Sequence, residues 1–335
     1  MIAMKTGKLS FPWQMLLLVL PVLTGLICLC IGRISIPLRE VWGALAGNPQ
    51  ISNMTRMTVW NLRLPRILLA ALAGAGLSAA GCAFQSLFAN PLATPDTLGV
   101  ASGASFGAAL GLLLGLPLLG VQLTALLMGT AAVALTWLAG SGKNKGLSTV
   151  VLAGIMMGSL FNAMVSLVKF IADEESQLPA ITYWLMGGLN NAAFKTLVMG
   201  APPILAGILM MYLLRWRMNL LPLSEDEARA SGVNIQVLRA ITVVCATMVT
   251  ASCVSMCGQV GWVGLLVPHM CRMKFGSNHL ALLPASISFG AAFLIIVDTV
   301  ARSACPQEIP ISILTAIIGA PFFIILMRKS GGWSL

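Results

Sequence analysis

The stretch WQMLLLVLPVLTGLICLCI at residues 13–31 decides the fold class of this chain. It contains no charged residue, and its apolar residues do not alternate with polar ones as they would in a strand of a membrane barrel. A helix needs about 20 apolar residues to cross the hydrocarbon core of a bilayer, and this stretch is close to that length. It therefore predicts a transmembrane helix and an all-α fold.

Lys5 and Lys8 precede this stretch, as they would in a secretory signal peptide. However, the apolar run is long for a signal, and no A-x-A-like cleavage site follows it. We therefore expect the run to remain as the first transmembrane helix.

The composition extends this conclusion to the whole chain. Hydrophobic residues make up 58% of the 335 residues, charged residues make up 9%, and the mean hydropathy is +0.92. Such values exclude a soluble domain and predict a polytopic membrane protein, here a single transmembrane domain over residues 1–335. We expect about ten transmembrane helices, some of them short or broken. The predicted spans lie near 13–32, 62–86, 96–115, 118–139, 149–171, 196–214, 236–256, 260–273, 281–303 and 309–327.

An even number of spans places both termini on one side of the membrane. Most basic loop residues then share that side, which the positive-inside rule identifies as the cytoplasm, while the acidic cluster at 173–176 lies outside. The exception is the first external loop, which carries five arginines: Arg33, Arg39, Arg56, Arg63 and Arg66. These five cations on the outer side need a separate explanation.

A charged segment interrupts the apolar sequence at about residues 215–239. Ser224 followed by Glu227 is the pattern of a capping box, and Gly232 is placed to end the short helix in the left-handed conformation. A helix of about two turns is unstable alone in water, so it needs a surface to lie against. Asn234 is suited to cap the next long helix. We expect this segment to contact a partner.

Glycines mark two interrupted segments, one in each half of the chain. In the first, Gly99, Gly103, Gly107, Gly111 and Gly115 recur every four residues, which predicts a ridge on which a neighbouring helix packs closely. The second runs over residues 258–272. Short or broken helices in corresponding positions of two halves are typical of an inverted repeat in a transporter.

The sequence offers no catalytic motif. It contains no HExxH and no GxSxG, and its two acidic runs, at 173–175 and 225–227, lie in predicted loop segments outside the spans. The GSGKNKG run at 140–146 lacks the first glycine of a phosphate loop and has Asn144 where Ser or Thr would bind magnesium, so it predicts a basic turn. We expect no catalytic residues and no cofactor.

Metal and nucleic-acid chemistry are also disfavoured. The eight cysteines fall mostly inside apolar segments, where they serve as small packing residues. Both histidines, His269 and His279, fall on the predicted cytoplasmic side, which disfavours a membrane redox enzyme. The net charge of +10 is spread thinly over the loops without interleaved aromatic residues. We expect no metal site and no nucleic-acid partner.

Many residues, in order and spacing over nearly the whole chain, match one family. In the first half these are Arg63-Leu-Pro-Arg66, Gly81, Gln85, Asn90-Pro-Leu-Ala93, Pro95, Leu98-Gly99 and Gly103-Ala104. In the second half they are Gly261, Val263-Gly264, Val267-Pro268-His269, Arg272, Pro284, Gly290-Ala291, Asp298, Ala301-Arg302, Glu308, Pro310, Gly319 and Pro321. With these motifs the chain resembles the permease subunits of ABC importers for ferric siderophores, haem and cobalamin.

Five residues depart from the pattern of that family. In the cytoplasmic segment, Ser224 and Ser231 replace a Gly and a Leu of the family. Gln259 stands where the family has Pro, Trp262 where it has Phe, and Ser312 where it has Gly. These departures concern the substrate subtype more than the function.

The resemblance implies ten transmembrane helices per subunit, two permease subunits around a central path, two cytoplasmic ATPase subunits and an external substrate-binding protein. It places the chain in the bacterial inner membrane, with an iron(III) siderophore or related metal chelate as cargo and cobalamin or haem as the alternative. The charged segment would then be the contact with the ATPase. Its coupling residues are Leu221, Leu223, Ser224, Glu225, Glu227, Ala228 and Gly232.

The same resemblance suggests a function for three arginines at the outer side. Arg63 and Arg66 flank Pro65, and Arg302 lies near the outer end of the ninth span, where it is four residues from Asp298. We expect the three guanidinium groups to dock acidic residues of the binding protein, with snorkelling at the interface as the alternative. An ion-coupled secondary transporter is the rival function, but the predicted spans offer few ionisable residues at mid-membrane.

Overall fold

The computed structural model describes residues 9–140, 147–305 and 307–329, and the described residues form helices and loops without a strand. The helices are α1 (Phe11–Cys30), α2 (Leu38–Leu45), α3 (Asn53–Met57), α4 (Leu64–Leu87), α5 (Val100–Leu113), α6 (Leu118–Gly140), α7 (Leu147–Ile171), α8 (Gln177–Leu185), α9 (Phe194–Leu214), α10 (Glu225–Ala230), α11 (Ile235–Cys257), α12 (Val263–Phe275), α13 (His279–Ser303) and α14 (Ile311–Lys329). A π-helical turn, Thr58–Arg63, joins α3 to α4, and 3-10 turns lie at Pro95–Leu98 and Arg217–Leu220. The all-α fold class is confirmed.

Each predicted span coincides with a helix, but not every helix is long enough to cross a bilayer. Within the described residues, seven helical stretches are long and apolar enough by length and composition, and the longest joins α3 to α4 over 35 residues. Of the remaining three, α5 and the apolar part of α14 are shorter, and α12 has 13 residues. The count of ten membrane crossings is therefore not confirmed, although the ten helices are present.

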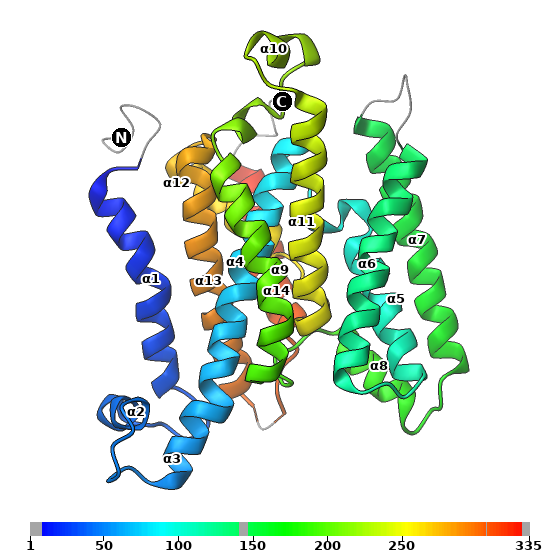
Figure 1. Cartoon of the computed structure of the whole chain (residues 1–335). Helices are drawn as coiled ribbons and strands as arrows, with labels where there is room; N and C mark the ends of the chain where they lie inside the picture. The colour runs from blue at the N-terminus through cyan, green and yellow to red at the C-terminus, as the bar shows by residue number, and fades with distance from the viewer. Residues whose placement is uncertain (1–8, 141–146, 306, 330–335) are drawn as a thin grey trace.

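Three short helices, α2, α3 and α8, lie where the sequence predicted loops. Figure 1 shows all three at the end of the molecule opposite α10. The π-turn keeps the chain helical from α3 into α4, so Arg63 and Arg66 lie within a helix and not in a loop.

The centre of the molecule is α4, which has 20 buried residues and packs against α11, α12 and α13. Glycine permits this packing, because a Cβ atom at Gly81 would lie 1.8 Å from the Gly264 oxygen and one at Gly74 would lie 2.2 Å from the Gly290 oxygen. Gln85 adds a polar link, since its Oε1 accepts a hydrogen bond of 2.7 Å from Arg272.

The glycine ridge of α5 packs against α6. A Cβ at Gly107 would lie 2.2 Å from the Thr124 oxygen, and Gly103 and Gly111 also face α6. Gly99 differs from the expectation, because it precedes the helix with φ +77° and approaches α7. Gly115 follows the helix with φ +64° and meets no neighbour within 4 Å among the described residues. The ridge therefore spans the three glycines inside α5.

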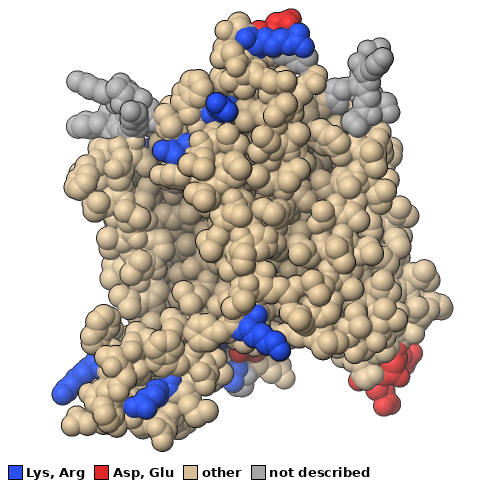
Figure 2. Space-filling model, viewed as in Figure 1, with Lys and Arg blue, Asp and Glu red and all other residues tan. Residues whose placement is uncertain are grey.

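Charged side chains gather at the two ends of the molecule. Figure 2 shows acidic and basic groups at the α10 end and at the opposite end, with an uncharged band between them on this face. Such a band matches the hydrocarbon core of a bilayer.

Candidate functional site

The first candidate site is the charged tip at α10, which projects from one end of the bundle (Figure 1). The predicted capping box is confirmed: Ser224 N donates to Glu227 Oε2 over 3.0 Å, and Glu227 N donates to Ser224 Oγ over 3.4 Å. These hydrogen bonds hold the pKa of the Glu227 carboxyl below its ordinary value. The helix begins at Glu225, whose side chain lies outside the described part of the chain.

Apolar contacts and backbone bonds anchor this short helix. Leu221 and Ala228 are fully buried, and Val233 N donates to the Ala228 oxygen over 3.1 Å. Arg239 of α11 donates to the Leu221 and Leu223 oxygens at 3.4 Å. The tip is therefore a defined structure and not a solvated loop.

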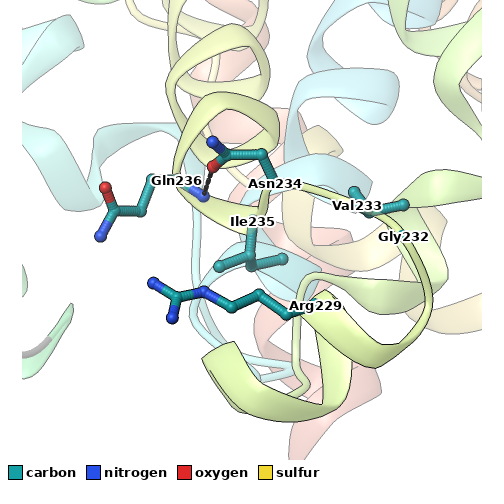
Figure 3. Close-up of a pocket in the computed structure, with 6 residues that line it drawn as sticks. All are labelled: Arg229, Gly232, Val233, Asn234, Ile235 and Gln236. Carbon is teal, nitrogen blue, oxygen red and sulfur yellow. Dashed lines mark hydrogen bonds between the residues drawn. The ribbon is translucent and has the colours of Figure 1, made fainter.

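Two further predicted features of the tip are confirmed. Gly232 has φ +74° and ends α10 in the left-handed conformation, as expected of glycine at that position. Asn234 caps α11 by accepting hydrogen bonds from Gln236 N and Val237 N at 3.1 and 3.2 Å. These residues surround a groove of about 270 Å³, shown in Figure 3, where the Arg229 and Gln236 side chains extend in the same direction.

The tip is connected to α13 through the 3-10 turn that follows α9. Asn219 accepts a hydrogen bond of 2.9 Å from His279 N, and its amide donates to Asn278 over 3.2 Å. The His279 ring lies 3.0 Å from the same Asn219 oxygen and 2.6 Å from Ser86 Oγ. Through these hydrogen bonds, His279 fixes the start of α13 to Asn219 and to Ser86.

The second candidate site is a cavity of about 550 Å³ where the two glycine-interrupted segments meet. Asp96 and Ala101 line it from the first segment, and Gln259, Trp262 and Gly264 line it from the second. Ser312 of α14 completes the wall and donates to the Met186 oxygen over 2.5 Å. Segments from both halves of the chain therefore build one cavity.

Unusual backbone conformations shape this cavity. Trp262 has φ +68°, an uncommon value for a residue other than glycine, and its ring packs on Gly319 and Phe323. Such outliers persist only where surrounding contacts hold them, and they concentrate at functional sites. The three residues that depart from the resembled family in this part of the chain, Gln259, Trp262 and Ser312, all line the cavity.

Asp96 is a site residue that the sequence analysis did not single out. It was expected to begin an apolar span, whereas the structure places it in the 3-10 turn before α5, exposed and lining the cavity. Its Oδ1 accepts a hydrogen bond of 3.1 Å from Ala101 N. The sequence feature that could have identified it is a carboxylate inside a stretch that is otherwise suited to cross the membrane.

The third feature is an ion-pair network at the end opposite α10. Arg66 donates to Asp298 through Nε and Nη2, at 2.9 and 2.8 Å to Oδ1, and to Glu308 through Nη1 at 2.9 and 3.0 Å. Asp298 also lies 3.9 Å from Arg302, the neighbour expected from their spacing. The carboxylate therefore pairs mainly with Arg66, and only secondarily within its own helix.

The structure corrects the expected exposure of the three arginines. Arg63, Arg66 and Arg302 are 5%, 9% and 8% exposed, because each guanidinium is turned into the protein. Arg63 donates to the backbone oxygens of Leu29 and Ile34, and Arg302 donates to the Cys28 oxygen over 2.7 Å. The three groups bind partners inside the protein: Arg63 and Arg302 bind backbone oxygens at or just after the end of α1, and Arg66 and Arg302 share Asp298. Their role in docking stays a prediction.

The described residues do not bring three metal-ligating side chains together. The His269 ring packs against Phe322 and Phe323, with centroids 6.5 and 5.3 Å apart. Paired histidine ligation by this histidine and His279 therefore has no support in the geometry.

Comparisons with known proteins agree with these features. The model of the FecCD transport family matches residues 17–329. The molybdate import system permease protein of Haemophilus influenzae is 40% identical over 318 residues, which are 93% of this chain and 94% of that protein. The "Probable iron chelatin transport system permease protein" of Helicobacter pylori is 33% identical over 288 residues, 85% of this chain and 86% of that protein.

A solved structure is also similar over almost the whole length. It shows an inward-facing conformation of an ABC transporter described as of the metal-chelate type. The TM-score is 0.87 at 39% sequence identity, and the match covers 96% of this chain and 100% of that one.

Proposed function

This chain belongs to the FecCD transport family and is a permease subunit of an ABC importer, and on that premise we propose that its cargo is an iron(III) chelate such as a ferric siderophore. The cargo reaches it from a substrate-binding protein outside the membrane. A second permease subunit completes the path, and separate cytoplasmic subunits hydrolyse ATP. Both termini then lie in the cytoplasm.

The tip at α10 supports the proposed contact with the ATPase. A two-turn helix that is capped, anchored and projecting offers a rigid shape that a groove on another protein can grip. The side chains proposed to make or support the contact are Leu221, Leu223, Ser224, Glu225, Glu227 and Ala228, with Gly232 closing the helix.

The lining of the cavity at the interrupted segments is the observation that supports an iron(III) chelate as the cargo. Of the described residues that line it, Asp96 alone is charged, and the rest are apolar or neutral polar. A small oxyanion needs hydrogen-bond donors and positive charge along its path, and a carboxylate there repels it. A wall of Trp262, Val254, Leu265 and Ala316 suits a large chelate that presents carbon to its surroundings.

The test is transport by the reconstituted importer. The permease is placed in liposomes with the ATPase subunit and the binding protein encoded beside it, and uptake of radiolabelled ferric siderophore is measured with and without internal ATP. We expect ATP-dependent uptake of the chelate. Absence of uptake by an assembly whose ATPase is stimulated by its loaded binding protein would refute the chelate as cargo.

Molybdate is the second candidate, because the Haemophilus influenzae relative named for molybdate is 40% identical over 93% of this chain. The same liposomes distinguish the two. Uptake of radiolabelled molybdate without uptake of chelates would establish the second candidate and show that Asp96 does not exclude anions from the path.

A further inference from the structure

A groove of about 780 Å³ lies between α1, α9 and α13, away from the cavity at the interrupted segments. α13 forms its floor and packs against α1, where Ser288 donates to the Leu17 oxygen over 2.6 Å. α9 packs against α4 and α11 and forms the other wall. All three helices are among those long and apolar enough to cross a membrane, so the groove lies at the depth of lipid.

The one charged residue of the groove lies at one end of its lining. Toward the α10 end the groove carries Gln14, Tyr212 and Arg215 beside the apolar Leu9 and Leu280. Farther along, the described lining is apolar except for Ser288, whose hydroxyl donates to the Leu17 oxygen. Arg215 is the one charged residue among the described residues that line the groove. An anion with an apolar tail complements this arrangement.

Within the described part of the chain, the polar and ring contacts of the Arg215 guanidinium come from Tyr212. Its Nη1 donates to the backbone oxygen of Tyr212 over 2.7 Å, and its Cζ lies 3.9 Å from the centroid of the Tyr212 ring. These contacts use one nitrogen and one face of the guanidinium, so the edge formed by Nε and Nη2 can bind two oxygens of a phosphate side by side.

The length of the groove matches one leaflet of the bilayer. Its floor runs along α13 from Leu280 to Ala291. At 1.5 Å per residue this is about 16 Å, and one leaflet of the hydrocarbon core is about 15 Å deep. An acyl chain that starts at the headgroup level near Arg215 would therefore end near the bottom of the groove.

We propose that this groove binds an anionic phospholipid of the leaflet on the α10 side, with its phosphate on Arg215 and one acyl chain between α1 and α9. The bilayer surrounds these helices and supplies such lipids continuously. The bound chain fills the space between α1 and α9 and holds α1 against the bundle.

Native mass spectrometry of the full-length permease in detergent tests the headgroup contact. Dioleoyl phosphatidylglycerol is titrated against dioleoyl phosphatidylcholine, whose headgroup has no net charge. We expect about tenfold tighter binding of the anionic lipid, because both headgroups present a phosphate to Arg215 but only phosphatidylcholine brings a choline cation that the guanidinium repels. Arg215→Gln should remove the preference, whereas Arg217→Gln, an exposed cation two residues on that does not line the groove, should keep it.

A second pair of variants tests the acyl chain. Ile208→Trp fills the groove and should lower binding of both lipids severalfold, whereas Leu209→Trp, at a 57% exposed position beside it, should leave binding unchanged. Equal losses for Arg215→Gln and Arg217→Gln would show general surface attraction and overturn the proposal. Equal behaviour of the two tryptophan variants, or absence of any lipid preference in the unmodified chain, would overturn it as well.

Discussion

At the scale of single residues, the most consequential group is Arg66. Its guanidinium joins α4 to Asp298 of α13 and to Glu308 in the loop before α14, and the Asp298 side chain is 1% exposed. Desolvating these charges is costly, and their mutual pairing offsets the cost. Removing one partner therefore leaves the other buried without compensation.

We expect Arg66→Gln to destabilise the permease by about 3–5 kcal/mol, the usual cost of breaking a buried ion pair from one side. Thermal unfolding of the purified chain measures this. Glu308→Gln should cost less, because the Glu308 side chain is 26% exposed. Arg39→Gln, which changes an exposed cation of the same end, serves as the control and should have no effect. Equal melting temperatures for Arg66→Gln and Arg39→Gln would contradict the buried role.

Docking of the binding protein stays a prediction for Arg63, Arg66 and Arg302, and their burial changes how it must be tested. Charge reversal would place an unpaired carboxylate in the interior, so the milder Arg302→Gln is the better variant. We expect weaker association with the binding protein at low salt and a reduced salt dependence. Unchanged affinity in a correctly folded variant would limit these arginines to holding the end of the bundle.

The sequence predicted which residues depart from the family but not that they meet. Gln259, Trp262 and Ser312 stand as three separate substitutions along the chain, and only the fold brings them to one cavity. The sequence analysis did not identify Asp96 as a site residue, because hydropathy is averaged over a window. A single carboxylate in an apolar stretch is then counted as part of the predicted span. The sequence singled out Arg63, Arg66 and Arg302, but spacing alone does not reveal whether a guanidinium points outward or inward.

At the scale of elements, the capping box of α10 gives a direct prediction. Ser224→Ala combined with Glu227→Ala removes both reciprocal bonds from a helix of six residues that has few others. We expect transport to fall severalfold, with normal membrane insertion and weaker co-purification of the ATPase. Asp226→Ala, which alters charge in the same helix without touching the box, is the matched control. Unchanged transport and co-purification in the double variant would exclude α10 from coupling.

The same box predicts a dependence on pH. Because hydrogen bonds from Ser224 lower the pKa of Glu227, the stabilisation is complete above the ordinary Glu pKa and is lost as the pH falls through the lowered value. ATPase affinity should therefore be constant from pH 8 to well below neutrality and weaken only in acid. In Glu227→Gln the amide oxygen accepts the same bonds without titrating. The difference between the curves of ATPase affinity against pH for the unmodified chain and this variant therefore measures the contribution of the Glu227 carboxylate. Identical curves would show that the box does not contribute.

Close helix packing gives the next prediction. A Cβ at Gly107 would lie 2.2 Å from a backbone oxygen of α6, whereas one at Gly158 of α7 would lie 3.6 Å from the Ser102 hydroxyl. Gly107→Ala should therefore lower the melting temperature and expression, and Gly107→Leu should do so more strongly. Gly158→Ala should be neutral or slightly stabilising, because Ala is the better helix former. A well-expressed, active Gly107→Leu permease would contradict this packing.

Long elements were more predictable from sequence than short ones. The ten apolar stretches each became a helix because their length and hydropathy leave few alternatives. α2 and α8 were missed because each is short, and its apolar contacts come from tertiary packing that hydropathy does not register. The number of crossings also could not be settled, since α5 and α12 have 14 and 13 residues, fewer than the roughly 20 that span a bilayer.

At the scale of the whole molecule, the two halves meet at the cavity that contains Asp96. The two interrupted segments that the sequence analysis paired both line this cavity. Their pairing could not give the chemistry of the cavity, which also depends on side chains from α11 and α14.

The charge of Asp96 is expected to affect which chelates pass. Asp96→Asn keeps an oxygen that can accept from Ala101 N but removes the charge, so stability should be preserved. We expect the ratio of uptake rates to shift toward the more anionic chelates by severalfold. Asp96→Ala separates the two effects, because it loses the hydrogen bond from Ala101 N as well as the charge. An unchanged ratio in Asp96→Asn would restrict this carboxylate to capping α5.

The hydrogen bonds at the two ends of α13 have a mechanical consequence. Asn219, next to the tip, holds the first residue of this 25-residue helix, and Arg66 holds Asp298 one turn from its other end. Twenty-five residues at 1.5 Å each make α13 about 37 Å long, and Pro284 near its start removes one backbone hydrogen bond from it. α13 is therefore held by side chains of other segments near both of its ends, and it links the tip at one end of the molecule to the ion-pair network at the other.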